Sequence, residues 1–353
     1  MTRIFPSICQ SNLLLIAAIC VPLLLSAQKE QYKVGCIGFY NVENLFDTED
    51  DPTIRDEDFT PEGALNYTEK IYTEKMGRIA DVIEQVGTEL SPDGLSILGL
   101  AEIENRKVLE DLVQHPTLAP RRYQIIHYNS PDRRGIDVAL LYQPKYFTPT
   151  ATRAVSMLVP TDEGDTLYTR DILLVSGTFD HDPIHILVNH WPSRRGGEKR
   201  SQPLRNMAAY RNKQIVDSLQ KANPQAKVVI MGDLNDDPVS PSVKEVLNAK
   251  GQKKKVAPQG LYNPMFQFYK KGIGTTAYRD AWSLFDQLIV SEGLLSEEQK
   301  GYYFHKAKVF NKKFLTQSSG QFKGYPKRTF AGGQYLGGFS DHFPVYLYLL
   351  KKV

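Results

Sequence analysis

Residues 228–237 read Val-Val-Ile-Met-Gly-Asp-Leu-Asn-Asp-Asp, an apolar run that passes directly into acids and an amide. The four apolar residues at its start predict a buried strand. Asp233 and Asn235 are two residues apart, so both side chains face one way if the chain stays extended. The end of a buried strand is a place where a rigid scaffold presents chemistry, so we looked for other strands with the same kind of end.

Four more apolar runs adjoin polar side chains. They place Asn41, Glu43 and Asn44 after the first run, Glu102 after residues 96–101, His190 after residues 186–189, and Asp341 with His342 before the last run. Taken singly, an acid at a strand end also fits a turn or a helix cap. Glu102 fits those roles less well, because a charge directly after a buried run needs a partner or a metal ion.

The spacing of apolar residues indicates the fold class. Strands are predicted at residues 34–39, 124–127, 138–142, 172–179, 184–189, 228–231, 287–290 and 344–350. Helices are predicted at residues 69–86, after a cap at Asn105, and from Pro203 onward. Several strands follow one another without a helix between them. Two sheets packed face to face with helices outside therefore fit better than an alternating βαβ chain.

No repeat, linker or low-complexity stretch interrupts residues 28–353, which predicts a single domain. The acidic stretch 47–58 and the basic tract 252–256 are expected to be solvated loops.

The first 27 residues contain one charge, Arg3, and an apolar run that ends at Ser26 and Ala27. This pattern predicts a signal peptide over residues 1–27 and a secreted or periplasmic protein. The alternative is an uncleaved membrane anchor, because Leu25 is not the small residue that cleavage prefers.

Loss of that segment would leave Cys36 as the single cysteine, together with 42 basic and 40 acidic side chains. No internal disulfide is then expected. With so little net charge, any attraction to a polyanion must be local.

The polar residues point to a class of reaction. Carboxylates, asparagine amides and two histidines suit Mg²⁺ or Mn²⁺ as cofactor, with imidazoles for proton transfer. Zinc held by thiolates is excluded by the cysteine count. A serine hydrolase would need a Gly-x-Ser-x-Gly elbow, which the sequence lacks.

In their order and spacing, these blocks resemble the signature blocks of the endonuclease/exonuclease/phosphatase superfamily, the DNase I-like proteins. The most specific are residues 231–235, Met-Gly-Asp-Leu-Asn, and residues 339–344, Phe-Ser-Asp-His-Phe-Pro. The resemblance implies an α/β (α+β) fold, a four-layered αββα sandwich of two packed mixed β-sheets flanked by helices. It also implies a divalent metal cofactor, Mg²⁺ or alternatively Mn²⁺ or Ca²⁺.

The resemblance assigns roles block by block. It implies metal binding by Glu102, Asn41, Glu43 and Asp341, and catalysis by His190, Asp233, Asn235, Asp286 and His342. Asp233 would position or deprotonate the attacking water, Asn235 would hold a phosphate oxygen, and Asp286 would orient His342. Asp137 fits either a substrate contact or a buried structural role.

The substrate is the least determined feature. Arg194, Arg195, Lys199, Arg200 and Arg205 follow His190 closely and either contact a phosphate backbone or form a solvated loop. We favour an extracellular nuclease acting on a nucleic acid substrate. A sphingomyelinase-like enzyme for lipid headgroups, an inositol phosphatase and a catalytically silent binding protein remain alternatives. The lipid alternative would use the aromatic segments 262–269 and 302–310 at a membrane. No obligate protein partner is evident.

Overall fold

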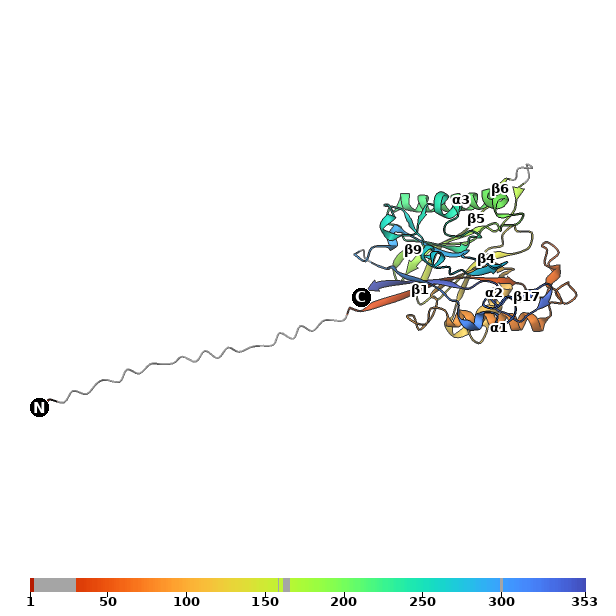
Figure 1. Cartoon of the computed structure of the whole chain (residues 1–353), viewed down its shortest axis with the longest axis horizontal. Coiled ribbons are helices and arrows are strands. Elements are labelled where there is room, and N and C mark those ends of the chain that lie inside the picture. Colours follow the sequence, from red (N-terminus) through yellow and green to blue (C-terminus); the bar gives the residue numbers. More distant parts are fainter. Residues whose placement is uncertain (3–29, 158, 161–165, 299–300) are drawn as a thin grey trace. The chain divides into compact units, whose positions relative to one another are not determined.

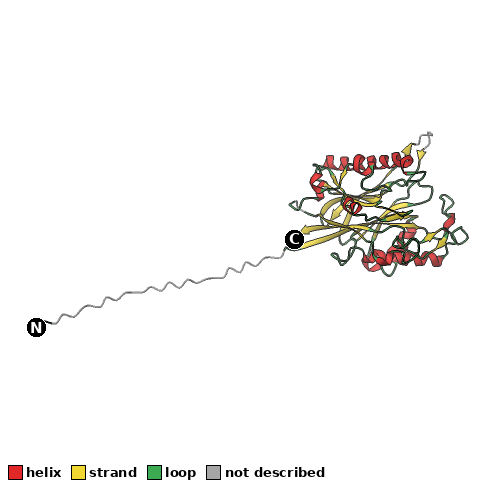
Figure 2. Cartoon of the chain, viewed as in Figure 1, coloured by secondary structure: helices red, strands yellow, loops and turns green. Residues whose placement is uncertain are grey.

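Two mixed β-sheets lie face to face in the computed structural model, and helices cover their outer faces (Figures 1 and 2). The structure describes residues 1–2, 30–157, 159–160, 166–298 and 301–353. The chain divides into two units, Met1–Gln31 and Tyr32–Val353, and the second contains both sheets. Except for Met1 and Thr2, the predicted signal peptide lies outside the described residues. Within the described ranges, no helix has the length and apolar character needed to cross a membrane.

The first sheet has six strands, and its central pair is parallel. Their order is β16 (Tyr303–Val309), β19 (Val345–Lys352), β1 (Tyr32–Leu45), β2 (Ile97–Ile103), β4 (Asp137–Tyr142) and β3 (Gln124–His127). The pair β1 and β2 is parallel, and the other neighbours are antiparallel.

The second sheet has seven strands and also has a parallel pair at its centre. Their order is β11 (Ala249–Lys250), β12 (Leu261–Tyr262), β15 (Asp286–Ser291), β10 (Val228–Asp233), β9 (Asp182–His190), β8 (Ile172–Phe179) and β5 (Phe147–Val155). Strands β9 and β10 are parallel, whereas β10 and β15 are antiparallel. Three two-stranded ribbons lie outside the sheets: β6 (Val159–Pro160) with β7 (Thr166–Leu167), β13 (Thr276–Tyr278) with β14 (Ala281–Ser283), and β17 (Phe330–Ala331) with β18 (Gln334–Tyr335).

Helices form the two outer layers. α1 (Glu69–Gln85) and α2 (Arg106–Gln114) pack on the first sheet, and α3 (Glu198–Ala222) packs on the second (Figure 1). The shorter turns are η1 (Glu57–Phe59), η2 (Ala119–Arg121), η3 (Ser242–Val246), η4 (Lys253–Lys255), α4 (Met265–Lys270), η5 (Glu292–Leu294) and η6 (Lys313–Leu315). As predicted, Asn105 caps α2, because its Oδ1 accepts a hydrogen bond from Val108 N at 3.1 Å.

Alternation along the strands explains the layers. In β10, Val229 and Met231 point between the two sheets, whereas Val228 and Ile230 point toward α3. Because both faces of this strand are covered, it needs an unbroken apolar run. The four-layered αββα sandwich expected from the sequence is confirmed.

Two local predictions were wrong, and a third was right only in part. Pro203 does not open α3, which begins at Glu198 with Gly197 before it at φ 109°. The segments 262–269 and 302–310 are not exposed aromatic loops, because Tyr262, Tyr302 and Phe304 pack into the core. The acidic stretch 47–58 is a loop with a short turn, yet it contains two buried acids, Asp47 and Asp56.

Candidate active site

Polar strand ends from both sheets meet at one edge of the sandwich. In the second sheet, Asp233 lies in register with His190 on β9 and with Asp286 on β15. The parallel strands β9 and β10 end side by side there, and the antiparallel β15 begins beside them. In the first sheet, Asn41 lies in register with Ala101, the residue before Glu102.

Irregular backbone turns the first-sheet side chains toward this edge. The pairing of β1 with β2 shifts register between Asn41 and Leu45, and Glu43, Asn44 and Glu102 have φ values of 53°, 50° and 65°. Such φ values are unfavourable for residues other than glycine and persist only where the surrounding structure holds them. A bulge of this kind redirects a side chain at the end of a strand.

Asn41 joins carboxylates of the two sheets. Its Nδ2 donates to Glu102 Oε1 and to Asp233 Oδ2, each at 3.1 Å. Glu102 Oε2 accepts from Asn44 N at 2.9 Å. His190 Nε2 lies 3.6 Å from Asp233 Oδ2 and 3.9 Å from Glu102 Oε1, so one imidazole faces both acids.

His342 reaches the same acids from the loop before β19. Its Nδ1 lies 2.6 Å from Asp286 Oδ2, and its Nε2 lies 3.9 Å from Asp233 Oδ2. Ser340 holds the loop, because its hydroxyl donates to Asn41 O at 2.7 Å and accepts from His342 N at 3.0 Å. The Asp286 carboxylate, which is fully buried, therefore fixes the orientation of the ring.

Neighbouring charges give the two buried histidines opposite charge preferences. Burial lowers the pKa of His190 well below its ordinary value, and the cations Arg170 and Arg134 lower it further. For His342, burial also disfavours the imidazolium, but the Asp286 carboxylate outweighs it and raises the pKa well above the ordinary value. The site thus pairs a neutral imidazole with a cationic one.

Burial also raises the pKa of Asp233 to about 7 against the opposing effect of His342, and Asp286 adds to the rise. A buried carboxylate without a fixed cation gains most from an added positive ion.

The donors fit a divalent ion. Two groups, Glu102–His190–Asp233 and Asp233–Asp286–His342, each offer ligand atoms that lie within 4.8 Å of one another. Carboxylate oxygens suit Mg²⁺ or Mn²⁺, whereas imidazole nitrogens are more typical ligands of transition metals such as Zn²⁺, so the carboxylates of Glu102 and Asp233 are the donors that fit these ions. Of the four residues expected to bind metal, this set includes Glu102 but not Glu43 or Asp341. Metal binding by Asn41, which donates to Glu102 and Asp233, stays a prediction.

Comparison with known proteins shows the family. The model of the endonuclease/exonuclease/phosphatase family matches residues 36–351. The chain belongs to this family. No curated protein matches it in sequence.

Three solved structures share the fold of this family member. D. rerio TDP2 complexed with single-strand DNA product has 13% identity and a TM-score of 0.54, over 90% of this chain and 98% of that one. An endonuclease/exonuclease/phosphatase family protein from Bacteroides thetaiotaomicron has 14% identity and a TM-score of 0.53, over 91% and 96%. The mannosyl-6-phosphatase of Bacteroides thetaiotaomicron has 15% identity and a TM-score of 0.52, over 89% and 99%. At these identities the likeness concerns the fold alone.

In this family member, Glu43 and Asp341 face an arginine. Glu43 Oε1 lies 3.4 Å from Arg328 Nε, and Arg328 also pairs with Asp341. Glu43 Oε2 accepts from Thr329 N at 2.7 Å, and its carbonyl accepts from the buried Lys75 ammonium. Burial and then Asp341 raise the pKa of Glu43 to about 7. Metal binding by Glu43 and Asp341 stays a prediction.

Asn235 is fixed by backbone contacts. Its Nδ2 donates to Trp191 O at 2.9 Å, its N donates to Asp233 Oδ1 at 2.9 Å, and its φ is 49°. The Asp233 carboxylate is thereby held by the turn that follows it. The phosphate contact expected of Asn235 stays a prediction.

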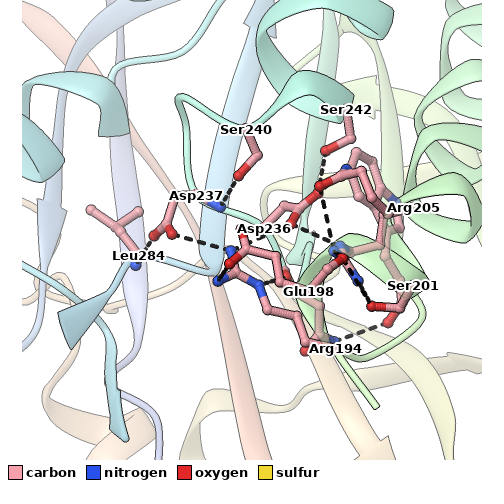
Figure 3. Close-up of polar contacts among 12 residues, drawn as sticks. Arg194, Glu198, Ser201, Arg205, Asp236, Asp237, Ser240, Ser242 and Leu284 are labelled. Atoms are coloured by element: carbon pink, nitrogen blue, oxygen red, sulfur yellow. Dashed lines mark hydrogen bonds and ion pairs between the residues drawn. The ribbon is translucent and has the colours of Figure 1, made fainter. Parts of the chain in front are cut away.

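The acids after Asn235 are bound by arginines (Figure 3). Arg205 Nε lies 2.7 Å from Asp236 Oδ1 in a fully buried ion pair, with the N–H poorly aligned for a hydrogen bond. Arg194 donates to Asn235 O at 3.0 Å and pairs with Asp236 and Asp237 at 3.4 and 3.2 Å. Arg194 therefore has a structural role that the sequence did not indicate.

The other predicted substrate contacts lie apart from this network. Arg195 is exposed, with Lys199 and Arg200, in the turn and first residues of α3. Asp137 is buried, and its Oδ2 lies 2.9 Å from His127 Nε2 while its Oδ1 accepts from Ser130 N. This pairing favours the structural role for Asp137, and its substrate role stays a prediction.

Sequence reasoning missed four side chains that support the site: Lys75, Arg170, Arg328 and Thr329. Arg170 donates from Nε to His190 O at 3.2 Å and also binds Trp191 O and Asp132. The three basic residues among them carry no local signal in the sequence, since a basic residue in a helix or loop is normally solvated. Ser340 belongs to the segment 339–344, but its hydrogen bonds to Asn41 and His342 appear only in the folded structure.

Proposed function

We propose that this protein is a divalent-metal-dependent phosphodiesterase. One observation carries the proposal: Glu102, His190, Asp233 and His342 come from four distant segments, yet their side chains meet. His190 Nε2 and His342 Nε2 lie 3.6 and 3.9 Å from Asp233 Oδ2, and His190 Nε2 lies 3.9 Å from Glu102 Oε1. A pocket of oxygen donors and imidazoles suits an in-line displacement at phosphorus. A member of the endonuclease/exonuclease/phosphatase family is expected to perform such chemistry.

The charge state of each side chain suits a different catalytic role. Asp233 positions the attacking water and accepts its proton, which suits a carboxyl group whose pKa is raised to about 7. His342, held cationic by Asp286, stabilises the charge that develops on the phosphoryl oxygens. His190, held neutral, donates a hydrogen bond near the leaving oxygen. A bound Mg²⁺ or Mn²⁺, held by the Glu102 carboxylate, would add Lewis-acid stabilisation.

We further propose that the substrate is a nucleic acid and that cleavage is endonucleolytic. The exposed Arg195, Lys199 and Arg200 follow the strand end that carries His190, where they can contact phosphates beside the cut bond. D. rerio TDP2, which shares the fold, was crystallised with a single-strand DNA product.

A second candidate is a small or lipid-linked phosphoester, such as a sphingomyelin headgroup or an inositol phosphate. Two of the five basic residues, Arg194 and Arg205, are bound internally, which leaves less charge for a polynucleotide. Exposed aromatic rings, Tyr278 and Trp282, lie on the ribbon that leads into Asp286. A membrane or headgroup contact could use such rings.

A substrate panel separates these candidates. Plasmid DNA, RNA, sphingomyelin vesicles and inositol phosphates would be assayed with Mg²⁺, Mn²⁺ or Ca²⁺ and with chelator. We expect chelator-sensitive cleavage of DNA or RNA that weakens as salt rises, because phosphate contacts release counterions. Cleavage of the lipid or inositol substrate alone would favour the second candidate. The matched Asp233→Asn variant should be inactive on every substrate, and full activity of that variant or of the chelated enzyme would refute the phosphodiesterase proposal. Ligand binding without turnover would indicate a silent binding protein.

We also propose that residues 1–27 are a signal peptide and that the enzyme acts outside the cytoplasm. Expression of the full chain in a Gram-negative host should yield a periplasmic or secreted protein whose N-terminal sequence begins near Gln28. An intact Met1 in the membrane fraction would instead indicate an anchor.

A further inference from the structure

A second group of buried acids lies beside the ends of β1 and β2. Asp47, Asp56 and Glu104 are 5%, 1% and 5% exposed. Asp47 follows β1, Glu104 follows β2, and Asp56 comes from the loop between β1 and α1. Buried carboxylates require protons, basic partners or a metal ion.

Basic side chains do not supply the missing charge. Lys107 Nζ lies 3.6 Å from Asp47 Oδ2, and the lysine is half exposed. Within the part of the chain that the structure describes, no lysine, arginine or histidine forms an ion pair with Asp56 or Glu104. This pair therefore differs from Asp236, whose charge is matched by Arg205.

Backbone amides bind only one oxygen of each acid. Glu104 Oε2 accepts from Asp47 N at 2.6 Å, and Asp56 Oδ2 accepts from Asp51 N at 2.9 Å. Burial raises the pKa of Glu104 to about 8, and the neighbouring carboxylates of Asp47 and Asp56 add to the rise. Asp56 Oδ1 is buried and has no hydrogen-bond partner. A buried acidic oxygen beside a second carboxyl group, with no donor, is an arrangement that a cation would complete.

The surroundings offer access and further oxygen atoms. A cavity of about 300 Å³ is lined by Glu104 but not by Asp56, and its other lining residues include Asp51, Thr53, Asn105 and Ser130. These side chains carry carboxylate, hydroxyl and amide oxygens, which are ligands for hard cations.

We propose that Asp56 and Glu104 form a second divalent cation site, distinct from the candidate active site and of the Ca²⁺ class. Ca²⁺ accepts about six to eight oxygen ligands in irregular geometry, whereas Mg²⁺ demands near-octahedral geometry and keeps several waters. Oxygens of the 47–58 loop and water complete the shell. The ion fastens this loop to the strand ends that carry Glu43 and Glu102. The site does not depend on the reaction proposed above.

The experiment must first silence the candidate active site, which also binds cations. The double variant Glu102→Gln/Asp233→Asn removes the carboxylates of the candidate active site and serves as the starting protein, called the background variant, for all measurements. Titration of this protein with CaCl₂ by calorimetry should show one bound Ca²⁺, and its melting temperature should rise with Ca²⁺. Adding Asp56→Asn should abolish both responses. Adding Asp58→Asn, an exposed acid of the same loop, should preserve both.

Two results would overturn the proposal. One is no Ca²⁺ binding to the background variant at millimolar concentrations, which would mean that Asp56 and Glu104 share a proton instead. The other is binding that survives Asp56→Asn.

Proteolysis supplies a readout if Asp56→Asn fails to fold. Trypsin can cleave after the exposed Arg55, inside the loop. In the background variant, Ca²⁺ should slow this cut by about tenfold or more, because cleavage requires local opening of the loop. An unchanged rate of cleavage would refute the site.

Discussion

Asp233 ends strand β10 and Asp236 lies three residues later in the turn that follows; both are buried, yet their surroundings differ. Asp233 faces an amide and two imidazoles, with no lysine or arginine paired to it among the described residues. Asp236 faces Arg205 and Arg194 and accepts from Ser242 Oγ at 2.6 Å (Figure 3).

The difference separates a site that can take a ligand from one that is already complete. A carboxylate with a fixed guanidinium has its charge matched inside the fold, so it contributes to structure. Asp233, which has none, keeps a raised pKa and can accept a proton or a metal ion. Substitutions at these two acids and at their partners test this contrast.

Asp233→Asn should reduce kcat by about a thousandfold or more, because it removes the group that activates water. The melting temperature without metal should stay the same or rise, because a buried carboxyl group with a raised pKa is replaced by a neutral amide. Steady-state kinetics on a chromogenic phosphodiester and thermal melts in chelator measure the two effects. A kcat within tenfold of the wild type would remove Asp233 from the mechanism.

Arg205→Met should lower the free energy of unfolding by about 3–5 kcal/mol, because it leaves the Asp236 carboxylate buried without its main cation. The kcat of the folded fraction should change less than tenfold. Urea unfolding measures the loss. The double variant Arg205→Met/Asp236→Leu should recover part of it, and a loss that is simply additive would contradict the pairing.

Asp286→Asn should lower kcat by about a hundredfold, because it removes the carboxylate that orients His342 and favours its charged form. The Asp286 carboxylate raises the pKa of His342, so the imidazolium should be lost at lower pH in the variant. The alkaline limb of the kcat profile should therefore move to lower pH. A uniform loss across all pH values would instead indicate a purely structural role.

Metal binding should depend on pH below about 7. Asp233 has its folded-state pKa raised to about 7, so in metal-free protein its contribution to stability is greatest at low pH and declines as pH rises through 7. A divalent ion should reverse that decline. Apparent Mg²⁺ affinity should rise by up to about tenfold per pH unit below 7, as one proton is displaced. Calorimetry between pH 5.5 and 8 would check this, and the Asp233→Asn variant should show a flatter dependence.

Much of the architecture could be predicted from local patterns. β3 and β8 begin and end at the predicted residues, and α1 ends one residue before its predicted limit. These elements are encoded by the period of their apolar residues, which does not depend on distant parts of the chain. Pro203 was misread because proline favours the first turn of a helix, whereas α3 begins earlier, at Glu198, and continues through Pro203. The early residues of α3 also make contacts that the sequence does not show, Arg205 with Asp236 and Gln202 Nε2 with Asp236 Oδ2.

The candidate site divides in the same way. The positions of Glu102, His190, Asp233 and His342, where apolar runs meet polar residues, can be recognised in the sequence, since a change from apolar to polar is a local property. The tertiary structure alone decided which acids have a fixed cation. Arg328 meets Glu43 across 285 positions of sequence, and Lys75 is buried beneath that strand end although it lies in a charged helix. Such pairings arise from the approach of distant segments in the fold, so no local pattern in the sequence encodes them.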